Sequence, residues 1–396
     1  MHSPIKVMCL VGARPNFMKA APLIDALERR KWAAVTLVHT GQHYSREMSD
    51  LFFDALGLPQ PQVDLQVGSG SHGEQTGQIM IRLEPLLKAG PPDLLVVFGD
   101  VNSTVAGALC AAKLGIPVAH VEAGLRSFDR TMPEELNRVV TDHVSEFLFT
   151  TERSGRENLL REGLPEDKIF FVGNVMVDTL LKHVEHARRL ETRRTFGLAS
   201  RAYGLLTLHR PSNVDQADTL REIMTAVKDL ATDLPILFPC HVRTRARLAA
   251  MPELLMTEAG TQGIVPLEPL GYLEFLSLMC EARLVLTDSG GIQEETTALG
   301  VPCVTLRHNT ERPVTIEHGT NVLAGTTHER IVEAGRAVLH NGRQPHRTPD
   351  LWDGHAADRI VDVLERHFHM GRCAPDRLHT PMKAGSKACA SQSLTQ

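Results

Sequence analysis

Residues 284–295 read Leu-Val-Leu-Thr-Asp-Ser-Gly-Gly-Ile-Gln-Glu-Glu, and this stretch decides the fold. An unbroken apolar and β-branched run at 284–287 is typical of a strand buried on both faces, as strands are in a parallel sheet. Gly290 and Gly291 then open a helical pattern, whose free N–H groups and dipole favour an anion. The stretch therefore predicts a parallel α/β sheet with an anion site beyond the carboxyl end of this strand.

The same alternation of strand and helix extends along the chain in both directions. Strands are predicted at 5–11, 35–39, 94–98, 117–121, 147–150, 169–172, 203–208, 235–238, 284–287 and 302–306. Amphipathic helices are predicted between them, at 19–30, 76–87, 105–113, 219–231, 273–280 and 292–299. Because 396 residues exceed one ordinary core, we expect two α/β domains, at 1–190 and 191–355. A last helix is expected at 356–369, followed by a disordered tail at 370–396, which lacks periodicity.

Composition excludes several classes of protein. The net charge of −5 gives no basis for a broad nucleic-acid-binding surface. No uncharged apolar run approaches the roughly 18 residues of a membrane span, and no signal peptide is evident at the start, so a cytoplasmic protein is expected. The seven cysteines are scattered without a CxxC, and the histidines show no metal-ligand spacing. Neither a disulfide framework nor a metal site is therefore predicted.

Charged residues follow the predicted strands, where ligands of parallel sheets bind. In the first half these are Arg14, Asp100 and Glu122, with Glu134 at a probable helix start. In the second half a strand ends at His209. We expect these side chains to line a cleft between the two domains. On the helix opened by the two glycines, Glu294 and Glu295 are expected in the first turn, near enough to contact a ribose hydroxyl.

The first strand is not followed by GxGxxG. The turn after it is Gly12-Ala13-Arg14-Pro15-Asn16, with one glycine and then an arginine. This disfavours a tightly bound dinucleotide, because that fingerprint needs glycines where the backbone approaches the pyrophosphate. No cofactor is therefore predicted.

These residues resemble the UDP-N-acetylglucosamine 2-epimerases. The motifs that match, in order, are GARP at 12–15, TGQHY at 40–44, GD at 99–100, HVEAGLRS at 120–127, PEELNR at 133–138, GN at 173–174, LHR at 208–210, DSGGIQEE at 288–295 and TERP at 310–313. The match extends over about residues 5–368. It implies the GT-B architecture, in which two Rossmann-like domains with parallel sheets face each other across a cleft and the C-terminal helix crosses back to the first domain. It also implies a homodimer.

The resemblance assigns roles to particular positions. It makes Arg14, Asp100, Glu122, Glu134 and His209 catalytic, with Arg14 and His209 also contacting the UDP. The remaining residues assigned to UDP are Lys19, Phe275 near the uracil, Ser289, Gly290, Gly291, Glu295 and Arg312. His241 is expected close to the cleft.

The chemistry at C2 of such a substrate limits the mechanism. The C2 proton is not α to a carbonyl, so simple deprotonation is out of reach, and transient oxidation needs the nicotinamide that the sequence disfavours. The remaining route expels UDP from C1 to give a 2-acetamidoglucal and adds it back after protonation on the other face. Clustered carboxylates and a helix N-terminus that holds the diphosphate suit this route. Four alternatives stay open: a hydrolysing 2-epimerase, a 2-epimerase of a UDP-diacetamido sugar, a GT-B glycosyltransferase, and a UDP-sugar-binding protein without activity.

Overall fold

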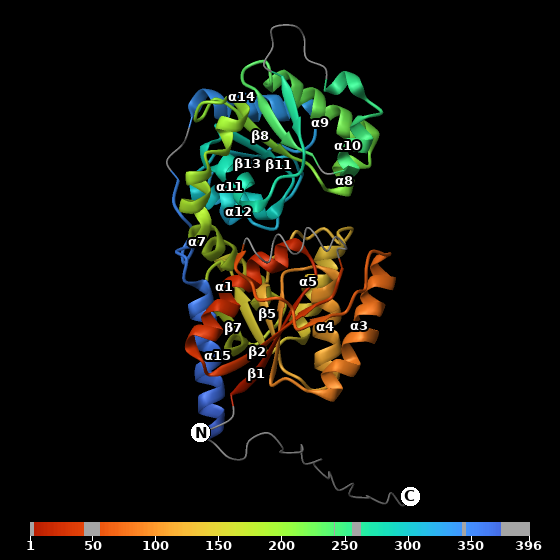
Figure 1. Ribbon diagram of the computed structural model, residues 1–396, viewed down its shortest axis with the longest axis vertical. Helices are drawn as coiled ribbons and strands as arrows, with labels where there is room; N and C mark the ends of the chain where they lie inside the picture. Colours follow the sequence, from red (N-terminus) through yellow and green to blue (C-terminus); the bar gives the residue numbers. More distant parts are fainter. Residues whose placement is uncertain (1–3, 43–55, 241, 256–262, 343–345, 374–396) are drawn as a thin grey trace, which may run out of the picture.

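The computed structural model describes residues 4–42, 56–240, 242–255, 263–342 and 346–373, and they form two parallel α/β domains (Figure 1). The first sheet contains β1 (Ile5–Val11), β2 (Ala33–His39), β3 (Val63–Asp64), β4 (Leu94–Phe98), β5 (Val118–Ala123), β6 (Phe147–Thr150) and β7 (Ile169–Phe171). The second contains β8 (Gly204–Thr207), β9 (Ile236–Pro239), β10 (Ile264–Leu267), β11 (Leu284–Thr287), β12 (Cys303–Thr305) and β13 (Asn321–Leu323).

The two sheets share one strand order. The order is β3-β2-β1-β4-β5-β6-β7 in the first sheet and β10-β9-β8-β11-β12-β13 in the second. The paired strands in both sheets are parallel. In each sheet the order reverses direction beside the first strand of the domain, between β1 and β4 and between β8 and β11. Ligands of doubly wound sheets bind beyond the strand ends at such a switch point. The topology therefore places two candidate binding edges in this chain.

Helices cover both faces of each sheet. In the first domain they are α1 (Arg14–Arg30), α3 (His72–Ala89), α4 (Asn102–Lys113), α5 (Pro133–Val144), α6 (Arg153–Arg161) and α7 (Val175–Leu190). In the second they are α8 (Pro211–Val214), α9 (Ala217–Leu230), α10 (Val242–Leu248), α11 (Tyr272–Glu281), α12 (Gly290–Leu299), α13 (Val314–Glu317) and α14 (His328–Asn341), and α15 (Ala356–Cys373) follows. Apolar strands such as β4, buried at every position, account for this double covering.

The last helix, α15, crosses back and packs on α1 and α7 of the first domain (Figure 1). Asp178 of α7 accepts the backbone N–H groups of Ala356 and Ala357, so its carboxylate caps the free N-terminus of α15. On the exposed side, Arg30 of α1 pairs with Asp362 at 2.6 Å. Helix α7 also packs on α11, and it therefore joins the apolar cores of the two domains.

The predicted fold class is confirmed: two parallel-sheet α/β domains with a C-terminal helix that returns to the first domain. β1, β4, β6 and β11 match their predicted bounds. Three strands were not predicted, β3, β10 and β13, which are two to four residues long and lie at or near the edges of their sheets. Helix α15 continues to Cys373, beyond the predicted end at residue 369, and residues 374–396 of the predicted tail lie outside the described residues.

Candidate active site between the two domains

The carboxyl ends of the two sheets face each other (Figure 1), and side chains bridge between them. Arg312 of the second domain donates from Nη2 to Glu122 Oε1 of the first at 3.1 Å. Arg210 and Arg307 of the second domain reach the sulfur of Met132 in the first, at 4.0 and 3.9 Å. The predicted cleft is therefore lined by charged groups from both domains.

Glu122 owes its position to an irregularity in β5. The register between β5 and β6 shifts between Val121 and Ala123, so Glu122 is the extra residue of a β-bulge, and its φ of +77° is a value that favours glycine. Strained backbone of this kind persists where the surroundings hold it in place and is concentrated at functional sites. The carboxylate is buried, with Oε1 2.7 Å from Nζ of Lys19 on α1.

Asp100 directly follows β4 and a tight turn at Gly99, whose φ is +62°. Its Oδ2 accepts from Arg138 of α5, at 3.0 Å from Nε and 2.9 Å from Nη2. Burial acts to raise the pKa of Asp100, but Arg138, Lys19 and Arg312 together outweigh burial and hold this pKa below its ordinary value. Asp100 is therefore an ionised carboxylate near neutral pH, as a general base must be.

The two glutamates at the start of α5 have different surroundings. Glu135 accepts from the backbone N–H groups of Ser127 and Phe128 and pairs with Arg138, so it fixes the loop before the helix. Glu134 is half-buried, and no hydrogen bond or ion pair holds its carboxylate among the described residues. Of the two, Glu134 is thus the one whose carboxylate has no partner among the described residues, and its catalytic role stays a prediction.

Ser289 is the N-cap of α12, and Gly290 is its first helical residue. A Cβ on Gly290 would lie 2.4 Å from Nη1 of Arg312, so the close approach of this guanidinium requires glycine here. The expectation that Glu294 and Glu295 lie in the first turn is wrong, because four residues from Gly290 onward complete that turn. Glu295 instead accepts from the Tyr272 hydroxyl at 3.1 Å. Phe275 lies one turn after Tyr272 on α11 and is half-buried.

Arg312 is the centre of the buried ion network. Besides Glu122 it pairs with Glu294 through Nε at 2.8 Å and with Glu311 through Nη1 at 2.5 Å. Burial disfavours the charge on Arg312, but the three carboxylates outweigh burial and raise its pKa well above the ordinary value. Glu311 is also buried, yet Arg312 and Arg307 lower its pKa well below the ordinary value. The pKa of Glu294 is raised, mainly by burial. Nη1, Nη2 and Nε of Arg312 thus each meet a carboxylate, and a diphosphate that binds this guanidinium has to displace at least one of them.

His209 follows β8 and pairs through Nδ1 with Asp288 Oδ1 at 2.9 Å. The Asp288 carboxylate also accepts from the backbone N–H groups of His209 and Arg210, and its side chain is fully buried. Burial acts to raise the pKa of Asp288, but His209 and these N–H groups lower it below its ordinary value. With Nδ1 bound to Asp288, Nε2 of this half-exposed ring is the nitrogen that has no partner among the described residues.

Of the predicted site residues, Asp100, Glu122 and His209 lie at or just beyond strand ends and Glu134 lies at the start of α5, whereas Lys19, Phe275 and Glu295 lie within helices. The Arg14 side chain and His241 lie outside the described residues, and the backbone of Arg14 begins α1. Four charged residues were missed: Arg138, Glu311, Arg307 and Asp288. All but Arg307 lie inside the quoted motifs, and nothing in the sequence showed which anion each cation would meet.

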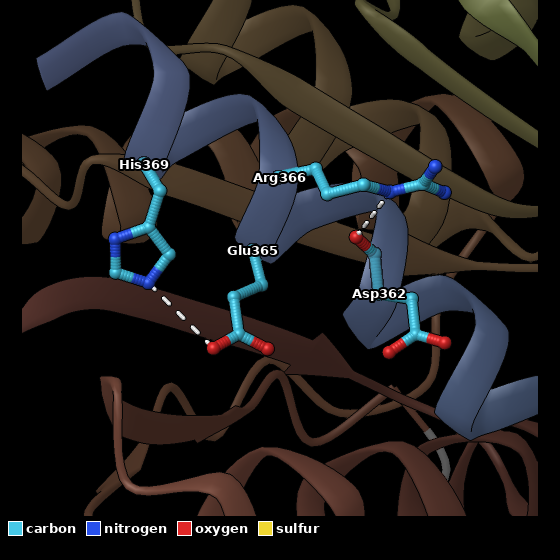
Figure 2. A pocket seen from close by; sticks show the side chains of 4 residues that line it. All are labelled: Asp362, Glu365, Arg366 and His369. Atoms are coloured by element: carbon cyan, nitrogen blue, oxygen red, sulfur yellow. Dashed lines mark hydrogen bonds and ion pairs between the residues drawn. The ribbon is translucent and has the colours of Figure 1, made fainter. Parts of the chain in front are cut away.

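A concavity of about 570 Å³ lies away from this cleft, on α15 (Figure 2). It is lined by Asp362, Glu365, Arg366 and His369. Within this helix His369 faces Glu365 at 3.6 Å and Arg366 donates to the Asp362 carbonyl, while the carboxylates of Asp362 and Glu365 also pair with Arg30 of α1. Across the described residues, no group of three or more His, Cys, Asp or Glu could hold a metal ion, and no helix has the length and apolarity to cross a membrane.

Comparison with known proteins identifies the relatives of this chain. The family model of UDP-N-acetylglucosamine 2-epimerase matches residues 25–365. The UDP-N-acetylglucosamine 2-epimerase of Methanocaldococcus jannaschii is 46% identical over 91% of this chain and 99% of its own. Its crystal structure in complex with UDP-GlcNAc and UDP has a TM-score of 0.85, with 91% of this chain and all of that chain covered. The UDP-2,3-diacetamido-2,3-dideoxy-D-glucuronate 2-epimerase of Pseudomonas aeruginosa is 39% identical, with 91% and 100% covered.

Proposed function

Since this chain belongs to the UDP-N-acetylglucosamine 2-epimerase family, we propose that it interconverts UDP-N-acetylglucosamine and UDP-N-acetylmannosamine by inverting C2. The observation that carries the proposal is the division of charge across the cleft. Ionised or ionisable carboxylates extend from the first domain, and a cation cluster beside a helix N-terminus extends from the second. A reaction that moves a proton at C2 while a diphosphate leaves C1 needs both.

The second domain supplies most of the groups that bind the leaving UDP. When the bond from C1 to the phosphate oxygen breaks, its electron pair stays on the UDP, and the developing charge is stabilised by Arg312 and the free N–H groups that Gly290 and Gly291 present beside Ser289. Lys19 adds a cation from the first domain. His209, oriented by Asp288, stabilises or protonates the departing phosphate. Glu295 and Phe275 hold the ribose and the uracil.

Carboxylates of the first domain transfer the proton at C2. One carboxylate removes it as UDP leaves, and the C–H electron pair becomes the C1–C2 double bond of 2-acetamidoglucal. A second carboxylate then protonates C2 from the opposite face while the phosphate oxygen returns to C1. We assign these steps to Asp100 and Glu134, with Glu122 supporting the positive charge that develops near C1. Arg138 keeps Asp100 ionised, the state in which a carboxylate can accept the C2 proton.

Proton NMR in deuterated water tests this proposal with the purified enzyme and UDP-N-acetylglucosamine alone. We expect UDP-linked N-acetylmannosamine that carries deuterium at C2. Free N-acetylmannosamine and UDP would instead identify a hydrolysing enzyme, and absence of C2 exchange without an acceptor would identify a glycosyltransferase or a binding protein. Preferential turnover of UDP-2,3-diacetamido-2,3-dideoxy-D-glucuronate would move the substrate assignment to that sugar.

We further propose that the chain forms a homodimer through its first domain. Exposed apolar side chains on this domain support the proposal: Ile81 on α3, and Leu136 and Val140 one turn apart on α5. Sedimentation should give twice the monomer mass, and Ile81→Glu or Val140→Glu should shift it toward the monomer. Val322→Glu, at an exposed apolar residue of the second domain, is the control and should leave the mass unchanged. A monomeric wild-type protein would refute the dimer.

A further inference from the structure

A buried histidine lies beneath the strand ends that carry Asp100 and Glu122. His120 is on β5 with a fully buried ring, and both ring nitrogens meet oxygen atoms. Nδ1 is 2.7 Å from Asp142 Oδ1 of α5, and Nε2 is 2.7 Å from the backbone carbonyl of Gly99. Since a carbonyl oxygen only accepts, Nε2 carries a hydrogen.

The partners of Asp142 establish the second hydrogen on the ring. Its Oδ2 accepts from the backbone N–H of Gly124 at 3.1 Å and lies 2.7 Å from Nη1 of Arg126. Burial acts to raise the pKa of Asp142, but His120 and Arg126 outweigh burial and hold this pKa below its ordinary value. An ionised carboxylate only accepts, so Nδ1 must donate to it. His120 is then an imidazolium with both nitrogens donating, inside a sheet that excludes water.

The carbonyl that His120 binds belongs to the peptide immediately before Asp100. The N–H of Gly99 donates to the Val121 carbonyl at 2.9 Å, and the carbonyl of Asp100 accepts from Asn137 Nδ2 at 2.9 Å. The peptides on both sides of the Asp100 Cα are therefore bound. Asp142 accepts the backbone N–H of Gly124, which lies two residues beyond Glu122. The ion pair of His120 and Asp142 therefore also fixes the bulged end of β5.

A role in stability alone does not account for this arrangement. A buried ion pair gives little net stability, because desolvation offsets the attraction of its charges. A neutral histidine would donate to one of the two oxygens, and an apolar side chain would leave the Gly99 carbonyl free to shift. What the charged ring adds is a fixed distance between α5 and the turn that presents Asp100. Displacements of about 1 Å at a reacting group can lower a rate about 100-fold.

We propose that His120 is a positioning residue: an imidazolium whose two ring nitrogens donate to Asp142 and to the Gly99 carbonyl, and which thereby holds Asp100 at C2 of the substrate. The effect on turnover rests on the proposed function, because it requires Asp100 to act on the C2 proton. The charge of the His120 ring does not depend on the proposed function.

Neutron crystallography of the deuterated wild-type enzyme near pD 8 tests the charge without any substitution. We expect deuterium on both Nδ1 and Nε2 of His120 and none on Asp142. A single deuteron on the ring would overturn the proposal, whatever the enzyme proves to catalyse.

Two substitutions test the positioning role. His120→Gln keeps an amide donor near the place of Nε2, so it can still bind the Gly99 carbonyl, whereas the shorter side chain of His120→Asn reaches only toward Asp142. We expect kcat to fall about 10- to 100-fold in His120→Asn with KM changed less than about threefold, and much of kcat to return in His120→Gln. The rate of C2 deuterium exchange should fall in step with kcat. Equal losses in both variants, or a loss confined to KM, would overturn the proposal.

His328→Asn is the control for loss of a histidine–aspartate pair, because His328, which is partly exposed, pairs with Asp229 at 2.8 Å on the second domain. Its kcat should equal that of the wild type. The pH profile of kcat/KM gives a further readout, since Asp100 is surrounded by the charges of Arg138, Lys19, Arg312 and Glu311. In His120→Asn the acidic limb should move to higher pH as Asp100 loosens from Arg138, and an unmoved limb would count against positioning. Asp100→Asn separates the two ideas: full turnover there would refute the proposed role of Asp100 and leave the neutron result to decide the charge of His120.

Discussion

The two domains place an aspartate just beyond equivalent strands and use it differently. β4 and β11 occupy equivalent positions in their sheets; Asp288 directly follows β11, and Asp100 follows β4 after Gly99. The carboxylate of Asp288 is fully buried. It accepts hydrogen bonds from two backbone N–H groups and pairs with His209. Asp100 meets a single guanidinium, and its side chain stays 20% exposed at the cleft. Topology thus places a carboxylate at each edge, and only the neighbouring groups decide whether it holds the backbone or is available to a substrate.

Each domain brings both signs of charge to the cleft. In the first, Lys19 pairs with Glu122 and Arg138 with Asp100; in the second, Arg307 and Arg312 share Glu311. Opposite charges therefore meet when the domains approach, as in the contact between Arg312 and Glu122. A UDP-sugar brings its own negative charge and would compete for the same arginines.

Replacing the two aspartates in turn tests this comparison most strongly. Asp100→Asn should lower kcat about 100- to 10,000-fold and lower stability less than Asp288→Asn, because it removes a base while the partly exposed side chain can still accept from Arg138. Asp288→Asn should lower the free energy of unfolding by about 1–3 kcal/mol, because a fully buried acceptor of several N–H groups loses its charge. Steady-state kinetics and urea unfolding measure the two effects. If both variants lost activity and stability equally, the distinction between the two aspartates would be wrong.

A substitution in the second domain that displaces Arg312 should have a smaller effect. This effect is on the affinity for UDP. A Cβ in Gly290→Ala would lie 2.4 Å from Arg312 Nη1 and 2.7 Å from Glu311 Oε1, so the guanidinium must move. We expect the Kd for UDP, measured by calorimetry, to rise about tenfold, which is about 1.4 kcal/mol. Gly77→Ala on α3 is the control, because its Cβ would meet nothing within 4 Å. An unchanged Kd in Gly290→Ala would remove Arg312 from the diphosphate site.

The smallest expected effect concerns Glu152, which follows β6 and is buried. Burial raises its pKa from the ordinary 4.5 to about 8, and Arg312 lowers it less. A raised carboxyl pKa contributes stability that is present below about pH 4.5 and lost as pH rises through about 8. Tm should therefore fall between about pH 6 and pH 9 more steeply in the wild type than in Glu152→Gln. Glu146→Gln, at an exposed ion pair, should follow the wild type. Parallel curves for all three proteins would contradict the raised pKa.

Much of this architecture was predictable because it depends on local patterns. A central strand such as β4 is an unbroken apolar run, and the glycines before α12 mark a helix N-terminus, so both were recognised. The strands β3, β10 and β13 were not, because pieces of two to four residues have too few positions to show a period and depend on pairing with a neighbour. The quoted motifs likewise located the cleft residues one by one.

The sequence by itself determined two parallel α/β domains, the strand ends at which chemistry occurs, and the residue types available there. Only the tertiary structure decided which charges meet. Arg312 lies 190 residues from Glu122, and Arg138 lies 38 residues from Asp100, yet each pair is in direct contact. The physical reason is that charge–charge and hydrogen-bond energies depend on distance in space and on burial, neither of which is encoded by proximity along the chain. The same reason separates Asp100 from Asp288 and gives His120 its second proton.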